Sequence, residues 1–150
     1  MQDQTPARLR EKPSWLIHQL STAAHRLLVE RLAAAGARGY HYRVLAALAE
    51  FGASSQADLG RRALMDRSDV VAVVNELADL GHAERAADQA DRRRNVITIT
   101  PEGLARLGEL DRVLDGLQDE LLAPLPPAER SQLTTLLERV LDHHAAPDQL

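Results

Sequence analysis

The chain has 150 residues, of which 45% are hydrophobic, 27% are charged and only 3% are aromatic. This length suits a single domain, and the absence of cysteine excludes disulfide frameworks, zinc–thiolate sites and thiol nucleophiles. Since no apolar run approaches the length of a membrane span and no signal sequence begins the chain, we expect a soluble, cytoplasmic protein.

The net charge of −4 is distributed unevenly along the chain. Residues 101–150 hold ten of the 22 Asp and Glu residues, whereas Arg92-Arg93-Arg94 is the densest positive cluster. Because a partner meets a surface locally, the overall negative sign does not exclude a nucleic-acid partner.

The first third of the sequence predicts an arm followed by two helices. Met1–Lys12 is polar and has no periodicity, which predicts an unstructured arm. Pro13-Ser14 predicts a helix start with the serine as N-cap. Apolar residues at helical spacing then predict a helix from Trp15 to Gly36, about 30 Å long. A second helix is predicted over Tyr40–Phe51.

The middle of the chain predicts two shorter helices in succession. Ser55-Gln56-Ala57-Asp58 has the form of a capping box, which begins a helix through about Ala63. Asp66 and Ser68 can each cap the following helix, which ends at Gly81. The apolar residues of that helix recur at helical spacing and predict its buried face: Val70, Val73, Val74, Leu77 and Leu80.

The remaining sequence predicts a β-hairpin and two long helices. Val96–Thr100 is the only strongly β-prone run, and it is expected to pair with His82–Ala87 across a polar turn. Thr100-Pro101 then begins a helix that runs through Leu121. A last helix is predicted from about Ala128 to His144.

This order of elements predicts a mainly α-helical protein with a small β-hairpin wing, which is a winged helix-turn-helix flanked by long helices. The helix that ends at Gly81 is placed to enter a DNA major groove, with the hairpin beside it. The long helices carry more apolar surface than one small domain can cover, so we expect them to pair across a twofold axis. Such a dimer presents two reading heads to half-sites about one helical turn apart.

Short motifs in the wing resemble the multiple antibiotic resistance regulator (MarR) family. They are Asp91-x-Arg93-Arg94 and, where the next helix begins, Ile99-Thr100-x-x-Gly103. The resemblance covers residues 14–145 and implies cytoplasmic homodimers, usually repressors, that bind palindromic DNA and often release it on binding a small anionic or phenolic ligand. It also implies one domain, 1–150, with dimerisation helices at 14–36 and 101–145 and a DNA-binding lobe at 39–100.

The predicted recognition helix exposes a face that could contact DNA. Ser68 and Asn75 can hydrogen-bond to phosphates or base edges, and Val71 and Ala72 can touch a thymine methyl group. Ser68 equally suits a helix cap. Many relatives have Thr-Arg where this chain has Val71-Ala72, which leaves the bases that are read open. The candidate residues on this face are Arg67, Ser68, Val71, Ala72 and Asn75.

Cationic side chains outside that helix are further candidates. Arg92-Arg93-Arg94 lies at the hairpin turn, where guanidinium groups suit a narrow minor groove; the resemblance places Arg93 in that groove, with Asp91 holding its side chain. A solvated charged turn is the alternative. Arg61-Arg62 could contact phosphates or be ordinary surface charge, and Arg85 could pair with an acidic residue of its own fold.

Trp15, the only tryptophan, suggests a ligand site. Some urate- and phenolic-responsive family members pair a tryptophan here with charged residues before the recognition helix, where this chain has Asp66 and Arg67. A planar anion could stack on the indole and pair with the Arg67 guanidinium. Alternatively, Trp15 packs in the dimer core, Asp66 caps a helix and Arg67 is solvated. Three further residues complete the candidate ligand site: Gln19, His41 and Tyr42.

Neither a metal site nor an enzyme active site is predicted. His18 and His25 share a helix face and His143-His144 are adjacent, but none of the six histidines forms an H-x-x-x-H or H-E-x-x-H pair. The sequence has no nucleophile elbow, phosphate-binding glycine loop or inward carboxylate pair. We therefore expect no cofactor, metal or catalysis.

The sequence thus predicts a homodimeric transcription regulator, a repressor that binds inverted repeats in double-stranded DNA and is released by a small anionic aromatic ligand. The alternative is a helical dimeric protein-interaction module that kept the fold without operator binding. Neither interpretation involves a membrane.

Overall fold

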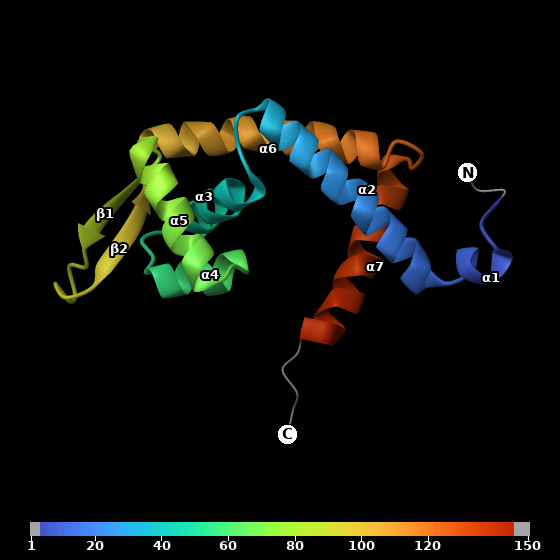
Figure 1. The fold of residues 1–150 in the computed structure, drawn as a ribbon, viewed down its shortest axis with the longest axis horizontal. Helices are drawn as coiled ribbons and strands as arrows, with labels where there is room; N and C mark the ends of the chain where they lie inside the picture. The colour runs from blue at the N-terminus through green and yellow to red at the C-terminus, as the bar shows by residue number, and fades with distance from the viewer. Residues whose placement is uncertain (1–3, 146–150) are drawn as a thin grey trace, which may run out of the picture.

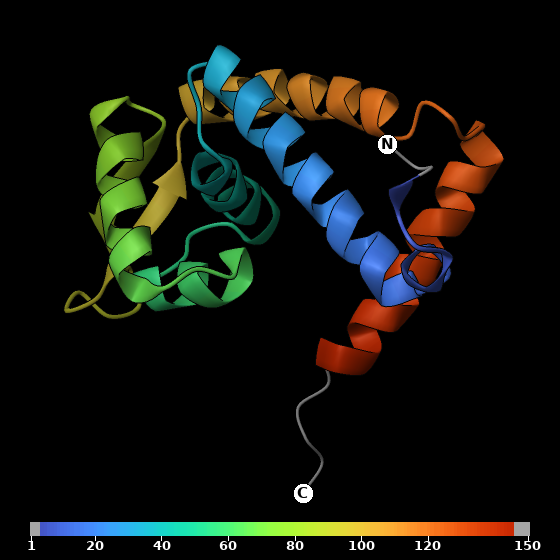
Figure 2. The same ribbon diagram turned by 45° about the vertical axis from the view of Figure 1, so that its right-hand side comes forward.

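The computed structural model describes residues 4–145, which form helices and one two-stranded sheet (Figure 1). The elements are α1 (Ala7–Arg10), α2 (Pro13–Ala34), α3 (Gly39–Phe51), α4 (Gln56–Ala63), α5 (Arg67–Asp79), β1 (Ala83–Ala87), β2 (Asn95–Ile99), α6 (Pro101–Leu121) and α7 (Pro127–Ala145). A lobe of α3, α4, α5 and the sheet lies at one end of a frame made by α2, α6 and α7 (Figures 1 and 2). The expected fold class, mainly helical with a β-hairpin wing, is confirmed.

Apolar side chains at helical spacing form the core of the lobe. On α5 they recur at i, i+3, i+4 and i+7, which leaves Val71 and Ala72 on the exposed side, as predicted. Leu80 was wrongly predicted on the buried face: it is the C-cap residue that follows α5, and it is 57% exposed. The largest buried side chains come from α3, α4, α5 and β2, and none is more than 1% exposed: Val44, Leu45, Leu48, Leu59, Val70, Val73, Val74, Leu77 and Ile97.

The wing is anchored to this core through its second strand. β1 and β2 pair antiparallel, with Ala83 opposite Ile99 at the base and Ala87 opposite Asn95 toward the tip. Ile97 is fully buried and also exchanges two backbone hydrogen bonds, of 3.0 and 2.8 Å, with Ser54 ahead of α4. This additional bridge joins the wing to the helix-turn-helix.

The helices of the frame are unequally covered. α2 packs along α6, and Leu32 and Leu110 of these helices belong to the same buried cluster as the core of the lobe. α7 turns away from the end of α6 (Figure 2), and none of the side chains of Pro127–Ala145 is buried. Within residues 4–145, no helix combines the length and apolar character needed to cross a membrane.

Two predictions about the N-terminal segment were wrong. Part of the expected arm over Met1–Lys12 forms the one-turn helix α1, which packs against α2 and follows Pro6, whose φ of −54° suits a helix start; residues 1–3 lie outside the described residues. Ser14 is not the cap of α2, because the helix begins at Pro13, whose fixed φ and missing N–H suit the first position.

The caps of the lobe helices differ from one another. Ser55 forms the predicted capping box with Asp58. Asp66 is the N-cap residue of α5, but its side chain makes no capping hydrogen bond. Ser68 lies inside α5, so the suggestion that it caps this helix was wrong, and its hydroxyl faces the exposed side.

Candidate nucleic-acid interface

The face of α5 opposite the core is open to solvent. All five residues predicted for this face are exposed: Arg67, Ser68, Val71, Ala72 and Asn75. They extend from the first residue of the helix through about two turns. Hydrogen-bonding groups beside two small apolar side chains suit the polar edges and thymine methyl groups of a major groove.

A side-chain contact joins this face to the wing. Arg85 of β1 donates to the Oδ1 atom of Asn75. Arg85 therefore pairs with an amide of its own fold rather than with the acidic partner that was suggested. Because the bond uses the carbonyl side of the amide, it leaves the NH₂ group of Asn75 as a donor toward a base or phosphate.

The tip of the wing presents three exposed arginines on an ordered turn. The carboxylate of Asp91 accepts a hydrogen bond of 3.0 Å from the backbone N–H of Arg93, and the Asp91 carbonyl accepts one of 3.0 Å from Arg94. Asp91 thus fixes the backbone of Arg93, whereas the resemblance implied that it holds the side chain. Within residues 4–145, Arg92-Arg93-Arg94 forms no ion pair, so its charge is open to a partner.

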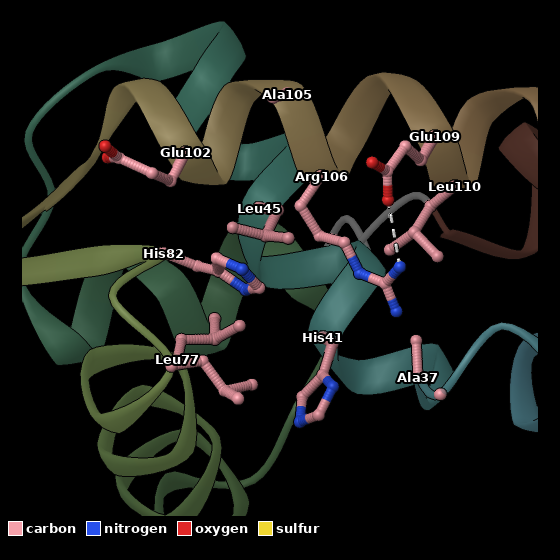
Figure 3. A pocket seen from close by; sticks show the side chains of 12 residues that line it. Ala37, His41, Leu45, Leu77, His82, Glu102, Ala105, Arg106, Glu109 and Leu110 are labelled. Atoms are coloured by element: carbon pink, nitrogen blue, oxygen red, sulfur yellow. Dashed lines mark hydrogen bonds and ion pairs between the residues drawn. The ribbon is translucent and has the colours of Figure 1, made fainter.

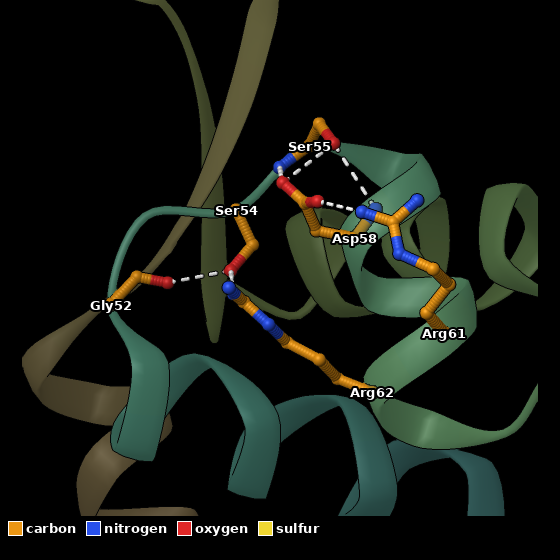
Figure 4. Close-up of polar contacts among 6 residues, drawn as sticks. All are labelled: Gly52, Ser54, Ser55, Asp58, Arg61 and Arg62. Atoms are coloured by element: carbon orange, nitrogen blue, oxygen red, sulfur yellow. Dashed lines mark hydrogen bonds and ion pairs between the residues drawn. The ribbon is translucent and has the colours of Figure 1, made fainter.

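Polar residues at the start of α4 engage the two arginines predicted on this helix (Figure 4). Ser55 Oγ accepts from the Asp58 N–H at 3.1 Å, and the Asp58 carboxylate accepts from the Ser55 N–H at 3.2 Å. Hydrogen bonds from the side chain and backbone of Ser55 hold the pKa of Asp58 below its ordinary value. Arg62 donates to Ser54 Oγ at 2.8 Å, whereas Arg61 pairs with Asp58 and keeps 72% of its side chain exposed. Arg61 is the better placed of the two for a phosphate contact.

A cleft opens where α3, α5 and α6 meet, and we call it the hinge cleft (Figure 3). It has a volume of about 470 Å³, and the rings of His41 and His82 and the guanidinium of Arg106 face its interior. Arg106 donates to Glu109 at 3.0 Å and also to the carbonyl of Ala35. Burial lowers the pKa of His82, as do the nearby Arg106 and His41.

Glu76 of α5 forms a hydrogen bond with His41, which lines the hinge cleft. Glu76 accepts a hydrogen bond of 2.6 Å from Nε2 of His41 and pairs with Arg38. The bond from His41, followed by that from Arg38, lowers the pKa of Glu76.

A second cavity, the α2–α3 pocket, has a volume of about 520 Å³. Its apolar wall includes Leu28, Val29 and Leu32 of α2. The hydroxyl of Tyr42 donates to Asp111 at 2.8 Å; burial and this aspartate raise the pKa of Tyr42 to about 12. The polar residues that line this pocket are His25, Arg38, Tyr40, Tyr42 and Arg43.

The structure does not bring the six predicted ligand residues together within one protomer. Trp15 and Gln19 lie in the first two turns of α2, whereas His41 and Tyr42 begin α3, and neither Trp15 nor Gln19 lines a cavity with them. Tyr42 lines the α2–α3 pocket and His41 the hinge cleft, but neither cavity is lined by Asp66-Arg67.

Sequence reasoning missed most of the residues that line these cavities. The stretch Arg38-Gly39-Tyr40-His41-Tyr42-Arg43 gathers basic and aromatic side chains directly after the end of the first long helix. That concentration was the available signal for a pocket. His25, which was weighed only as a metal ligand, lines the same pocket. Among residues 4–145, no three histidine or acidic side chains are close enough together to hold a metal ion.

Comparisons with known proteins agree with this geometry. The MarR family model matches residues 35–94, which contain α3, α4, α5, β1 and the turn of the wing. A curated protein of Thauera aromatica, named for transcriptional regulation of the hcr operon, is 33% identical over 99 residues, which are 66% of this chain and 60% of that protein. The chain therefore matches less than two thirds of the length of this relative.

Two solved structures match over nearly their whole length. BpsR of Bordetella bronchiseptica is 25% identical with a TM-score of 0.77, covering 92% of this chain and 99% of that one. The PcaV transcriptional regulator of Streptomyces coelicolor is 28% identical with a TM-score of 0.71, covering 92% of this chain and 97% of that one. The likeness thus includes the long helices outside the matched family model.

Proposed function

This chain belongs to the MarR family of winged helix-turn-helix transcriptional regulators, and we propose that it is a cytoplasmic homodimer that represses transcription from inverted-repeat operators. The observation that carries this proposal is the exposed face of α5 beside an arginine-tipped wing. As in other winged helices, α5 would enter the major groove while the wing follows the backbone. Catalysis forms no part of this function.

The DNA contacts divide between the two elements. On α5, Ser68 and Asn75 supply hydrogen bonds, and Val71 and Ala72 are small enough to lie against thymine methyl groups. At the wing, Arg93 reaches the adjacent minor groove, where the negative potential is greatest. The wing therefore contributes mainly affinity, and α5 contributes most of the sequence preference.

Ligand release is the second part of the proposal, and the α2–α3 pocket supports it. The DNA binding of BpsR is regulated by 6-hydroxynicotinic acid, and PcaV was crystallised with its natural ligand. In this chain the pocket offers an apolar wall together with Arg38 and Arg43. A small aromatic carboxylate matches this combination, because its ring covers apolar surface while its charge meets a guanidinium. A ligand set that includes Trp15 stays a prediction, since it requires residues from two protomers.

The DNA-binding proposal is tested by replacing one wing arginine. Genomic fragments bound by the protein are first selected at moderate salt, and an inverted repeat is expected among them. Arg93→Ala should then weaken binding to that repeat by about tenfold and flatten the dependence of log K on log salt by about one unit per protomer. Fluorescence anisotropy over a salt series measures both quantities.

Arg112→Ala provides the control, because it removes the same charge from an exposed position of α6. It should leave both the affinity and the salt dependence near those of the wild type. If no inverted repeat is recovered, or if the two variants bind DNA alike, the protein-interaction module becomes the better description.

A further inference from the structure

Glu76 ties the recognition helix to the segment that links α2 with the lobe. It follows Asn75 on α5, and its carboxylate accepts hydrogen bonds from Arg38 and, at 2.6 Å, from Nε2 of His41. These two partners lower the pKa of Glu76, His41 more than Arg38. The carboxylate is therefore ionised at neutral pH, and its negative charge attracts the guanidinium of Arg38.

Arg38 belongs to two sites at once. It is the N-cap residue of α3 and pairs with Glu76, and it also lines the α2–α3 pocket. The side chains of Arg38 and Glu76 are 59% and 41% exposed, so water and salt screen their attraction. An anion that enters the pocket meets a guanidinium that is only weakly held.

The lining of the pocket favours such an anion. None of the described residues that line it is acidic, and Arg43 adds a second guanidinium, 5.7 Å from the centre of the Tyr40 ring. Leu28 and Leu32 provide apolar surface for an aromatic ring. The ligand chemistry that fits is a small aromatic carboxylate.

We propose that Glu76 is an internal competitor of the ligand carboxylate for Arg38. When the ligand pairs with Arg38, Glu76 loses this partner and α5 loses its tie to the α2–α3 linker. This inference rests on the proposed ligand response and names the contact through which it operates. By linkage, Glu76 must weaken ligand binding by the same factor by which the ligand weakens the Arg38–Glu76 pair.

The first test measures ligand binding in the absence of DNA. Glu76→Gln removes the competing charge and keeps the length of the side chain. In calorimetric titrations it should bind benzoate and 6-hydroxynicotinate about three- to tenfold more tightly than the wild type does. Benzamide, which has no charge to pair with Arg38, should bind both proteins alike. Asp79→Asn removes one charge from the same helix outside this contact and should match the wild type.

The outcomes separate the competition from the ligand response itself. Equal carboxylate affinities in Glu76→Gln and the wild type overturn the competition and leave the ligand response standing. If neither protein binds either carboxylate, the proposed response to aromatic acids fails. A gain in benzamide binding equal to the gain in benzoate binding also overturns the competition, because the effect would then not depend on charge.

The second test examines the tie without any ligand. Operator affinities are measured for Arg38→Gln, Glu76→Gln and the double variant, with urea midpoints to show that each is folded. If the pair holds α5 in its DNA-binding position, each single variant binds the operator several-fold less tightly than the wild type. The double variant then binds no less tightly than whichever single variant has the lower affinity. Independent losses that multiply, or no loss at all, overturn the tie.

Discussion

The junction between the wing and α6 depends on one hydroxyl and one missing side chain. Thr100 Oγ1 accepts a hydrogen bond from the Gly103 N–H at 3.0 Å and donates to the carbonyl of Gly81 at 2.6 Å. A Cβ atom at position 103 would lie 2.0 Å from the carbonyl oxygen of His82. The Thr-x-x-Gly spacing therefore has a structural cause: the threonine caps α6, and the glycine lets the preceding turn approach.

Gly103→Ala should consequently destabilise the fold. The added methyl group meets backbone that cannot rotate aside, and overpacking of this kind costs about 1–3 kcal/mol. The free energy of unfolding in urea measures the effect. Gly108→Ala is the matched control, since it lies on the same helix with nothing within 4 Å of its Cβ position. It should instead raise stability by about 0.5–1 kcal/mol, and equal effects of the two substitutions would contradict the steric explanation.

His82 makes the stability of the lobe depend on pH. Burial, with Arg106 and His41 as smaller causes, lowers the pKa of His82 below its ordinary 6.5. The unfolded chain therefore binds this proton at a higher pH than the folded protein, so stability falls as the pH decreases through about 6.5. His82→Gln should reduce the loss in urea midpoint between about pH 7.5 and about pH 5.5. His18→Gln, on the exposed side of α2, should keep the full loss; the same loss in both variants would show that other groups cause it.

Single residues also show which features were predictable. Buried positions such as Val74 and Leu77 followed from periodicity, because helical spacing alone determines which side faces a core. The pairs that polar side chains form with one another could not be predicted from periodicity. Glu76 meets Arg38 across 38 residues of sequence, and that encounter depends on how two helices cross. Long, exposed side chains carry no periodic signal, so the contact proposed to transmit the ligand response was invisible in the sequence.

At the scale of elements, helix boundaries were predictable where a side chain satisfies the helix end. Ser55 forms the capping box that the sequence indicated, and Thr100, where a helix was predicted to begin, caps α6. The N-caps of α2 and α3 are Lys12 and Arg38, which make no side-chain capping bond, and there the predicted starts were displaced. Without a capping side chain, the start of α2 is set by Pro13, and nothing local in the sequence marks the start of α3 at Gly39.

The two strands of the wing form for different reasons. β2 has the β-branched composition that predicts a strand, and its Ile97 is fully buried. β1 reads Ala-Glu-Arg-Ala-Ala, which has little intrinsic β preference, and only Ala83 is buried. It is extended because β2 offers it a ladder of backbone hydrogen bonds. The hairpin was therefore predictable from the composition of β2 and from the polar turn that follows β1.

At the scale of the whole molecule, the frame leaves two apolar faces uncovered. The first half of α2 exposes Leu16, Ile17 and Leu20, each between 44% and 55% accessible. The exposed apolar residues of α7 are Leu136, Leu137, Val140 and Leu141. Because α7 buries none of its side chains, packing within one protomer adds little to the stability of this 19-residue helix. A second copy related by a twofold axis would cover both faces. How α2 and α7 are placed relative to each other could not be predicted from helix periodicity, because it depends on interhelical angles.

The dimer is tested most directly on α7. Leu137 and Leu141 lie one turn apart and are 47% and 70% exposed in the protomer. Because a twofold axis repeats every substitution, Leu137→Glu combined with Leu141→Glu changes four side chains in the interface. Each leucine that would bury its remaining surface in the interface contributes about 1 kcal/mol to dimer formation. Losing all four should raise the dimer dissociation constant by about 1000-fold.

Sedimentation velocity at micromolar protein should therefore show wild-type dimers and variant monomers. Operator affinity should fall in parallel, because two separate lobes lose the gain in effective concentration that a dimer provides at adjacent half-sites. Gln132→Glu adds charge at an exposed polar position of the same helix and should leave both measurements unchanged. A wild-type protein that sediments as a monomer would contradict the dimer, and a dimeric variant would place the interface elsewhere than on α7. In the first case the spacing of the two recognition helices would have to be set by the DNA rather than by the protein.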